Sequence, residues 1–328
     1  MTAASTRRLQ GIDKAIRRGT LAYLIAVVFL HPDPCLAAGN SSIWPEISGA
    51  YLGQKTPGMS PELFAPGLIS TDESEIGSVF SPDLHEFYFT TWTKETGTKI
   101  MVTRQRDGVW TVPEAASFSN HPSDVDVAIS IDGKKVFFGT RRPRPGEAED
   151  RQEGFDIWYA DRTAKGWGEE SFLGPVVNSG KSQVYPTITA DGTLYFQAVR
   201  QEGYGKADIY RSRLIQGAYQ MPENLGPIIN SEHYEGDVYV TPDESYMVVS
   251  IYGREDDLGG GDLYVSFRNP SGEWSPPKNM GPGINSDKRD FCPMVTPDGK
   301  YLFFSSKRLG VGDIFWVDAR VIEASRED

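Results

Sequence analysis

One phrase occurs five times in this chain and constrains the fold more than any other feature. Each copy holds a strand-like segment, a turn at an aspartate and a second strand-like segment. The copies are FSPDLHEFYFTT (80–91), ISIDGKKVFFGT (129–140), ITADGTLYFQA (188–198), VTPDESYMVVS (240–250) and VTPDGKYLFFSS (295–306). Their turn aspartates, Asp83, Asp132, Asp191, Asp243 and Asp298, are separated by 49, 59, 52 and 55 residues. A phrase that recurs at about this period indicates stacked or radial repeats.

Each copy continues into two further strand-like segments. In the fourth repeat, DLYVSF (262–267) follows the phrase as a third strand, and a short segment around KNMG (278–281) follows as a fourth. The 34 glycines, the 22 prolines and an aromatic content of 12% suit an all-β chain with many tight turns. Four antiparallel strands in about 50 residues match one blade of a β-propeller.

The number of fourth strands equals the number of repeats only if a segment before the first repeat is counted. The fifth copy ends after its third strand, whereas PELFAPGLIST (61–71) precedes the first copy and matches the fourth-strand phrase PKNMGPGINSD (277–287). We therefore predict an all-β fold: a single β-propeller of five four-stranded blades, with the N-terminal segment closing the last blade. Six blades are the alternative, if residues 41–58 form part of another blade.

The N-terminus is a separate element. Five basic residues precede the apolar run LAYLIAVVFL (21–30), and the small residues Ala37, Ala38 and Gly39 follow it. This order predicts a secretory signal peptide over 1–38, with an uncleaved membrane anchor as the alternative. The expected domains are then an irregular strap over 39–60, the propeller over 61–322 and a C-terminal tail over 323–328. The expected location is the periplasm or the outside of the cell.

The charge of the chain excludes some partners. Loss of residues 1–38 removes five basic and two acidic residues from totals of 33 and 45, which leaves a net charge of about −15. Such a charge argues against nucleic acid and against insertion in or binding to an anionic membrane. Cys292 is then the one cysteine left, so no internal disulfide is expected.

The repeat also carries a family resemblance. The SPDG-type turn, the following FF-S and the later G-D-I-aromatic segment, as in GDIFWVDA (312–319), resemble the TolB-like, WD-repeat-like β-propellers of bacterial envelope proteins. The resemblance covers roughly residues 61–320. It implies a secreted or periplasmic propeller that serves mainly as a binding platform, without specifying the ligand.

Charged residues recur at fixed offsets from the turns. Eight residues before each turn aspartate stand Glu75, Asp124, Gln183, Glu235 and Asp290. This position begins the innermost strand. Arginines follow the second strands, and aspartates begin most of the third strands, so three rings of charge converge on one mouth of the channel while the Pro-Asp turns lie at the other. Two interpretations remain open at this point: braces within blades and a ligand site.

Departures from the repeat mark the candidate ligand-binding positions. Two residues after the ring position stand Asp126, Tyr185 and Asp237, where the other repeats have Gly77 and Cys292. The candidate ligand-binding residues at the channel mouth are Glu75, Asp124, Asp126, Tyr185, Glu235, Asp237, Asp290, Arg200, Arg254 and Arg308.

Standard catalytic signatures are missing from the sequence. There is no G-x-S-x-G or H-E-x-x-H, and no histidine has a partner at metal-ligand spacing. We therefore predict a binding module for a protein, peptide or glycan, with no catalytic residues, metal site or cofactor. The alternative is a carbohydrate-active hydrolase or lyase that uses Glu75, Asp124, Glu235 and Asp290. A structural Ca²⁺ in the channel is a third interpretation.

Overall fold

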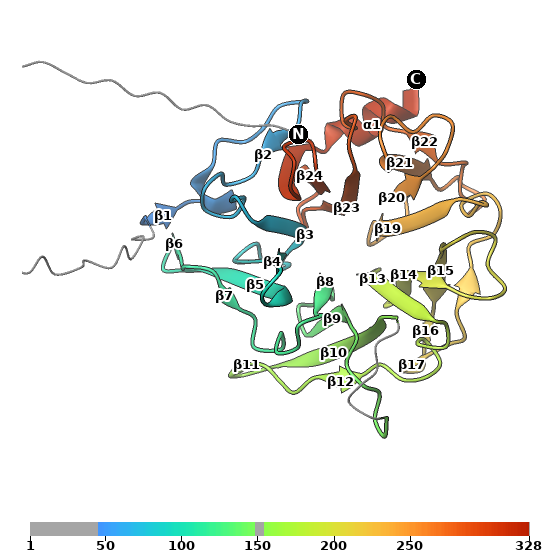
Figure 1. The fold of residues 1–328 in the computed structure, drawn as a ribbon, viewed down its shortest axis with the longest axis horizontal. Coiled ribbons are helices and arrows are strands. Elements are labelled where there is room, and N and C mark those ends of the chain that lie inside the picture. The colour runs from blue at the N-terminus through green and yellow to red at the C-terminus, as the bar shows by residue number, and fades with distance from the viewer. Residues whose placement is uncertain (1–44, 148–153, 328) are drawn as a thin grey trace, which may run out of the picture. The chain divides into compact units, whose positions relative to one another are not determined.

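The structure is a computed structural model that describes residues 45–147 and 154–327. All but two of its strands form five antiparallel sheets around a common axis, and the other two form a separate hairpin (Figure 1). The predicted all-β, five-bladed propeller is confirmed. We number the sheets as blades 1 to 5 in chain order. No sixth blade is present in the part of the chain that the structure describes, so the six-bladed alternative is not observed there.

The three long strands of each blade run outward from the axis in chain order. The innermost strands are β3 (Ser74–Phe80), β8 (Val125–Ile129), β13 (Ser182–Ile188), β19 (Tyr234–Val240) and β23 (Asp290–Val295). The second strands are β4 (Glu86–Thr93), β9 (Lys135–Thr140), β14 (Leu194–Val199), β20 (Tyr246–Tyr252) and β24 (Tyr301–Ser306). The third strands are β5 (Gly97–Arg106), β10 (Asp156–Thr163), β15 (Asp208–Ser212), β21 (Asp262–Phe267) and β25 (Asp313–Asp318).

The outer strands are two residues long. They are β7 (Glu114–Ala115), β12 (Ser171–Phe172), β18 (Glu223–Asn224), β22 (Lys278–Asn279) and β2 (Glu62–Leu63). Further short strands follow the third strands of blades 1 to 3: β6 (Val109–Trp110), β11 (Gly166–Trp167) and the hairpin β16 (Leu214–Ile215) with β17 (Ala218–Tyr219). Because the outer strands are so short, a side chain from each outer loop adds hydrogen bonds to the third strand of its blade.

That outer-loop side chain is an asparagine or a serine. Asn230 accepts a hydrogen bond from the Ile209 backbone N–H at 2.8 Å and donates one to the Ile209 carbonyl at 3.0 Å. Both residues are buried. The same two bonds join Asn178 to Ile157 and Asn285 to Leu263. In the other two blades a serine hydroxyl takes the place of the asparagine amide: Ser119 accepts from the Ile100 backbone N–H, and Ser70 accepts from the Ile314 N–H and donates to its carbonyl. Each blade thus satisfies a buried backbone position by a side chain.

The repeated turn has a structural role in each blade, because its aspartate is bonded to its own turn. Asp191 Oδ1 accepts hydrogen bonds from the Thr189 hydroxyl at 2.6 Å and from the Thr193 backbone N–H at 3.0 Å. Turns of this type are stabilised by such local bonds. The same two bonds recur at Asp83, Asp132 and Asp298.

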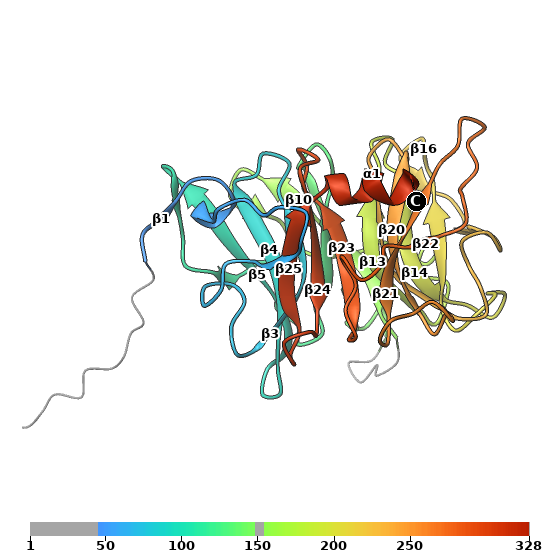
Figure 2. The same ribbon diagram turned by 90° about the horizontal axis from the view of Figure 1, so that it is seen from above.

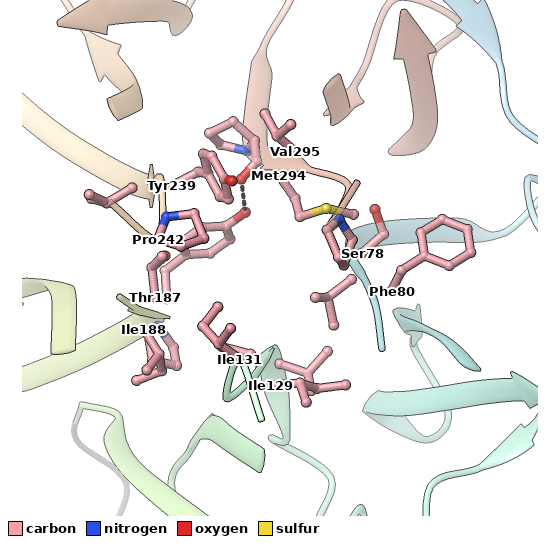
Figure 3. Close-up of a pocket in the computed structure, with 18 of the residues that line it drawn as sticks. Ser78, Phe80, Ile129, Ile131, Thr187, Ile188, Tyr239, Pro242, Met294 and Val295 are labelled. Carbon is pink, nitrogen blue, oxygen red and sulfur yellow. Dashed lines mark hydrogen bonds between the residues drawn. The ribbon is translucent and has the colours of Figure 1, made fainter. Parts of the chain in front are cut away.

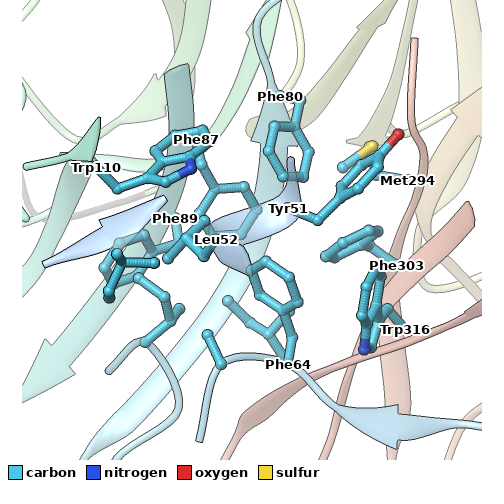
Figure 4. Close-up of a cluster of buried hydrophobic side chains, with 14 residues drawn as sticks. Tyr51, Leu52, Phe64, Phe80, Phe87, Phe89, Trp110, Met294, Phe303 and Trp316 are labelled. Atoms are coloured by element: carbon cyan, nitrogen blue, oxygen red, sulfur yellow. The ribbon is translucent and has the colours of Figure 1, made fainter. Parts of the chain in front are cut away.

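The N-terminal segment closes the ring as predicted. Strand β2 pairs with β25, with Glu62 opposite Trp316 and Leu63 opposite Phe315. Beside it, Phe64 is fully buried in an aromatic cluster that joins blade 5 to blade 1 (Figure 4). Its ring centroid lies 4.8 Å from that of Phe303 and 5.1 Å from that of Phe87. Aromatic packing therefore supports the hydrogen bonds of the closure.

Two further segments cover the ends of the blades. Strand β1 (Ile47–Ser48) pairs with β6, and the short 3-10 helix η1 (Tyr51–Gly53) buries Tyr51, whose hydroxyl donates to the turn aspartate Asp298 at 2.7 Å. The C-terminal helix α1 (Arg320–Glu327) lies across one end of the strands of blades 4 and 5 (Figure 2). The predicted domain boundaries stay predictions, and the predicted signal peptide lies outside the described residues.

Candidate functional site

The predicted ring of carboxylates is buried. Glu75 is 3% exposed, and Asp124, Glu235 and Asp290 are 0% exposed. Each accepts hydrogen bonds from the connection that precedes its own strand, from Thr71, His121, Ser231 and Ser286 respectively. These hydrogen bonds therefore hold the blade connections in place.

Two ring carboxylates also bind arginines of their own blades. Arg142 Nη2 donates to Asp124 at 2.7 Å, and Arg308 Nη2 donates to Asp290 at 2.7 Å. Arg200 donates to the Val177 carbonyl at 3.1 Å, and Arg254 pairs with Asp256. These contacts favour the brace interpretation for Asp124, Asp290 and the arginines. The assignment of the ring residues and of Arg200, Arg254 and Arg308 to a ligand site stays a prediction.

Burial leaves two ring carboxylates with raised pKa values. Burial raises the pKa of Glu235 to about 7, against hydrogen bonds from Ser231 that lower it, and the charge of Asp208 raises it further. Burial also raises the pKa of Glu75, with an added contribution from Asp313. Neither glutamate has an arginine partner among the described residues. The folding stability of the protein therefore depends on the protonation of these two groups.

The second set of predicted residues meets near the axis. Asp126, Tyr185 and Cys292 have φ values of 54°, 56° and 51°, and the pairing register shifts at each of these points. Such bulges redirect a side chain. Asp237 Oδ2 accepts hydrogen bonds from the Cys292 backbone N–H at 3.0 Å and from its Sγ at 3.4 Å. A methyl group on Gly77 would lie 3.5 Å from Asp126 Oδ1 and 3.8 Å from Cys292 Sγ, which places these groups together.

The axial cluster has more negative than positive charge. Burial, followed by the charge of Asp237, raises the pKa of Asp126 well above its ordinary value. Burial also raises the pKa of Asp237, and Arg289 opposes that rise. Arg289 donates to the Tyr252 hydroxyl at 2.6 Å and stacks on the Phe291 ring at 4.3 Å. Arg289 could not be recognised from the sequence, because it stands outside the repeated offsets.

A cavity of about 140 Å³ lies on the axis between this cluster and the Pro-Asp turns. Its wall is apolar and comes from the innermost strands, as Figure 3 shows for Ile129, Ile188, Met294 and Val295. Asp126 and Tyr185 also line it. At its rim stand turn residues, of which Ile131 is 46% exposed and Pro242 and Pro297 are exposed. The sequence did not predict this cavity, because its apolar wall has the same pattern as a packed core.

Two other features are missing from residues 45–147 and 154–327. No group of three or more histidine, cysteine, aspartate or glutamate side chains there is arranged to hold a metal ion. No helix in the same ranges is long and apolar enough to cross a membrane.

Comparisons with known proteins agree with the fold. A TolB from Acinetobacter baumannii is 14% identical, with a TM-score of 0.52, and the match covers 78% of this chain and 54% of that one. A structure described as a TolB from Agrobacterium tumefaciens is 16% identical, with a TM-score of 0.50, over 76% of this chain and 78% of that one. A structure of BT0996 in an RGII complex is 8% identical, with a TM-score of 0.51, over 83% of this chain and 90% of that one.

These likenesses concern the fold alone, because the identities are low. They support the resemblance to TolB propellers at that level. No protein-family model matches the chain. No curated protein matches it either.

Proposed function

We propose that the protein is a binding module that receives its ligand in the axial cavity, from the face that carries the Pro-Asp turns. The observation that supports this is the apolar cavity of about 140 Å³ with Asp126 in its lining. Concave apolar sites with a few placed polar groups are the usual ligand sites of proteins. The proposal keeps the ligand classes predicted from the sequence, a protein, peptide or glycan, and the predicted secreted or periplasmic location.

The competing binding site is the charged mouth at the opposite end of the channel. A shallow hollow there is lined by Ser231, His233, Arg254, Glu255 and Asp256. Its arginine is engaged, since Arg254 pairs with Asp256 at 3.2 Å and stacks on the Tyr264 ring at 4.9 Å. We favour the turn-side cavity of the two sites, because most of its lining is apolar and comes from the innermost strands.

The alternative function, a carbohydrate-active hydrolase or lyase, is not favoured by the ring carboxylates. A glycosidase needs two carboxyl groups that both reach the glycosidic bond. Glu75, Asp124, Glu235 and Asp290 are at most 3% exposed, and two of them bind arginines. A substrate would have to displace these contacts before any ring carboxylate could act on it.

A pair of rim variants tests the proposed site. The full chain and its Ile131→Asp and Arg254→Gln variants are applied to glycan and peptide arrays, and the strongest signals are converted to dissociation constants. Ile131→Asp should weaken binding by roughly tenfold or more, because it replaces apolar contact by a charge that must lose water. Arg254→Gln should change binding less than about twofold, because a rim charge outside the contact contributes little.

The opposite pattern would contradict the proposed site. If Arg254→Gln weakens binding and Ile131→Asp does not, the ligand enters at the charged mouth. Both positions are partly exposed, so thermal unfolding of the two variants should stay close to that of the unmodified protein.

A further inference from the structure

We infer that the axial cavity selects a small organic cation, namely an amine whose apolar body is about the size of a six-carbon ring and whose ammonium group contacts Asp126. This inference rests on the proposed function for the place of binding, the axial cavity, and it replaces the ligand classes predicted from the sequence by a small amine. Three observations carry it: the missing partner of Asp126, the charge balance at the axis and the size of the cavity.

The Asp126 carboxylate has no partner in the described structure. No residue there donates a hydrogen bond to it or forms an ion pair with it, although it lines the cavity. Its polar neighbours are engaged, because the Tyr185 hydroxyl donates to the Pro293 carbonyl at 2.8 Å and Asp237 accepts from Cys292 at 3.0 Å. A carboxylate partly withdrawn from bulk water without a partner is unfavourable, and a ligand donor would relieve this.

The charge balance at the axis favours a cation over an anion or a neutral ligand. Asp126 and Asp237 are two acids, and Arg289 is the cation whose charge acts on both. The Arg289 guanidinium is directed to aromatic groups, with its centre 4.8 Å from the Tyr252 ring and 4.3 Å from the Phe291 ring. With both acids ionised, one negative charge is left over. A ligand with one positive charge balances it, and the raised pKa of Asp126 agrees with a shortage of positive charge.

The size and lining of the cavity limit the rest of the ligand. Its volume of about 140 Å³ is close to that of an apolar cavity of about 150 Å³ that holds benzene in another protein. Apart from Asp126, the wall consists mainly of apolar side chains such as Val79, Ile129 and Val295. A polar body such as a sugar ring would lose its hydrogen bonds to water on entering, so the body of the ligand should be apolar.

The test compares two ligands of equal shape. Cyclohexylamine is cationic near pH 7, as lysine is, whereas cyclohexanol is neutral. Binding of each to the full chain is measured by isothermal titration calorimetry. We expect the amine to bind at least about tenfold more tightly than the alcohol, because a charge pair in a water-poor site is stronger than a neutral contact. This arm needs no variant, so it does not depend on the folding of a mutant.

Two variants then assign the difference to one residue. Asp126→Asn keeps the shape of the side chain, and asparagine tolerates the φ of 54° at this position. It should remove the preference for the amine, with the two ligands binding within about threefold of each other. Glu232→Gln removes one exposed carboxylate near the other mouth and should leave the preference unchanged.

The inference is overturned if amine and alcohol bind equally to the unmodified protein, if neither binds, or if Asp126→Asn keeps the preference. It is also overturned if a lysine-containing peptide binds in a manner that depends on Asp126 while cyclohexylamine does not, since the ligand would then be a polypeptide. Array binding that depends on Ile131 with no amine binding would remove this inference and leave the proposed function standing. Loss of both signals would remove both.

Discussion

At the scale of residues, Glu235 shows how a ring position is used for stability. Its folded pKa of about 7 lies above the ordinary value of 4.5, so the folded state holds the proton more tightly than the unfolded state does. Its stabilising contribution is therefore complete below about pH 4.5 and is lost as pH rises through about 7. Blade 3 already carries the neutral Gln183 at the equivalent position.

We predict that Glu235→Gln stabilises the protein at pH 8 by on the order of 2 kcal/mol and changes little at pH 5. Thermal or denaturant unfolding of both proteins at the two pH values measures this. Glu232→Gln, at an exposed neighbouring site, serves as the control and should show no such pH dependence. An equal effect of Glu235→Gln at pH 5 and pH 8 would show that burial of its charge is not what limits stability.

At the scale of elements, the outer strands depend on one side chain per blade. Replacing Asn230 by alanine leaves the Ile209 backbone N–H and carbonyl without their partner inside the blade. We predict a loss of about 2–4 kcal/mol in the free energy of unfolding, because each buried group left unpaired costs about 1–3 kcal/mol. Urea unfolding checks this, with Asn120→Ala as the control, since Asn120 is exposed and, among the residues that the structure describes, its side chain donates to Glu170 alone.

A loss below about 0.5 kcal/mol for Asn230→Ala would mean that water replaces the amide, and the outer strand would then be held by its ladder alone.

The elements also show how far the sequence determines the structure. The turns at Asp83 to Asp298 could be predicted because their bonds are local, and the role of 61–71 followed from its likeness to 277–287. The cavity could not be predicted, because the direction of the Asp126 side chain depends on a bulge at φ 54°. Nor were the ring carboxylates recognised as buried, although Thr71, Ser231 and Ser286 each stand four residues before their carboxylate. The repeat shows that such a pair recurs, but an acid at the start of a strand has the same pattern whether it faces solvent or is buried. Helix α1 was not predicted, because its eight residues make little more than two helical turns, which is too short a segment for a 3.6-residue pattern to be recognised.

At the scale of the whole molecule, closure of the ring depends on a short segment near the N-terminus. Phe64 is fully buried in the cluster between blades 5 and 1. We predict that Phe64→Ala costs about 3–5 kcal/mol. It should also make residues 54–61 more sensitive to limited proteolysis under native conditions, because the closing strand β2 detaches first. Phe138→Ala, an equally buried change in blade 2, should cost a similar amount without this local sensitivity.

Equal protease sensitivity of the N-terminal segment in the Phe64→Ala and Phe138→Ala variants would show that the ring opens elsewhere or unfolds as one unit.

Entry of the ligand into the axial cavity from the turn side can be measured on the whole molecule. Hydrogen–deuterium exchange of the full chain is compared with and without the strongest-binding glycan or peptide of the arrays. We expect slower exchange in 126–131, 185–190, 239–244 and 293–299, which line or border the cavity. Slower exchange in 231–235 and 253–257 at the charged mouth, with none around the cavity, would contradict it.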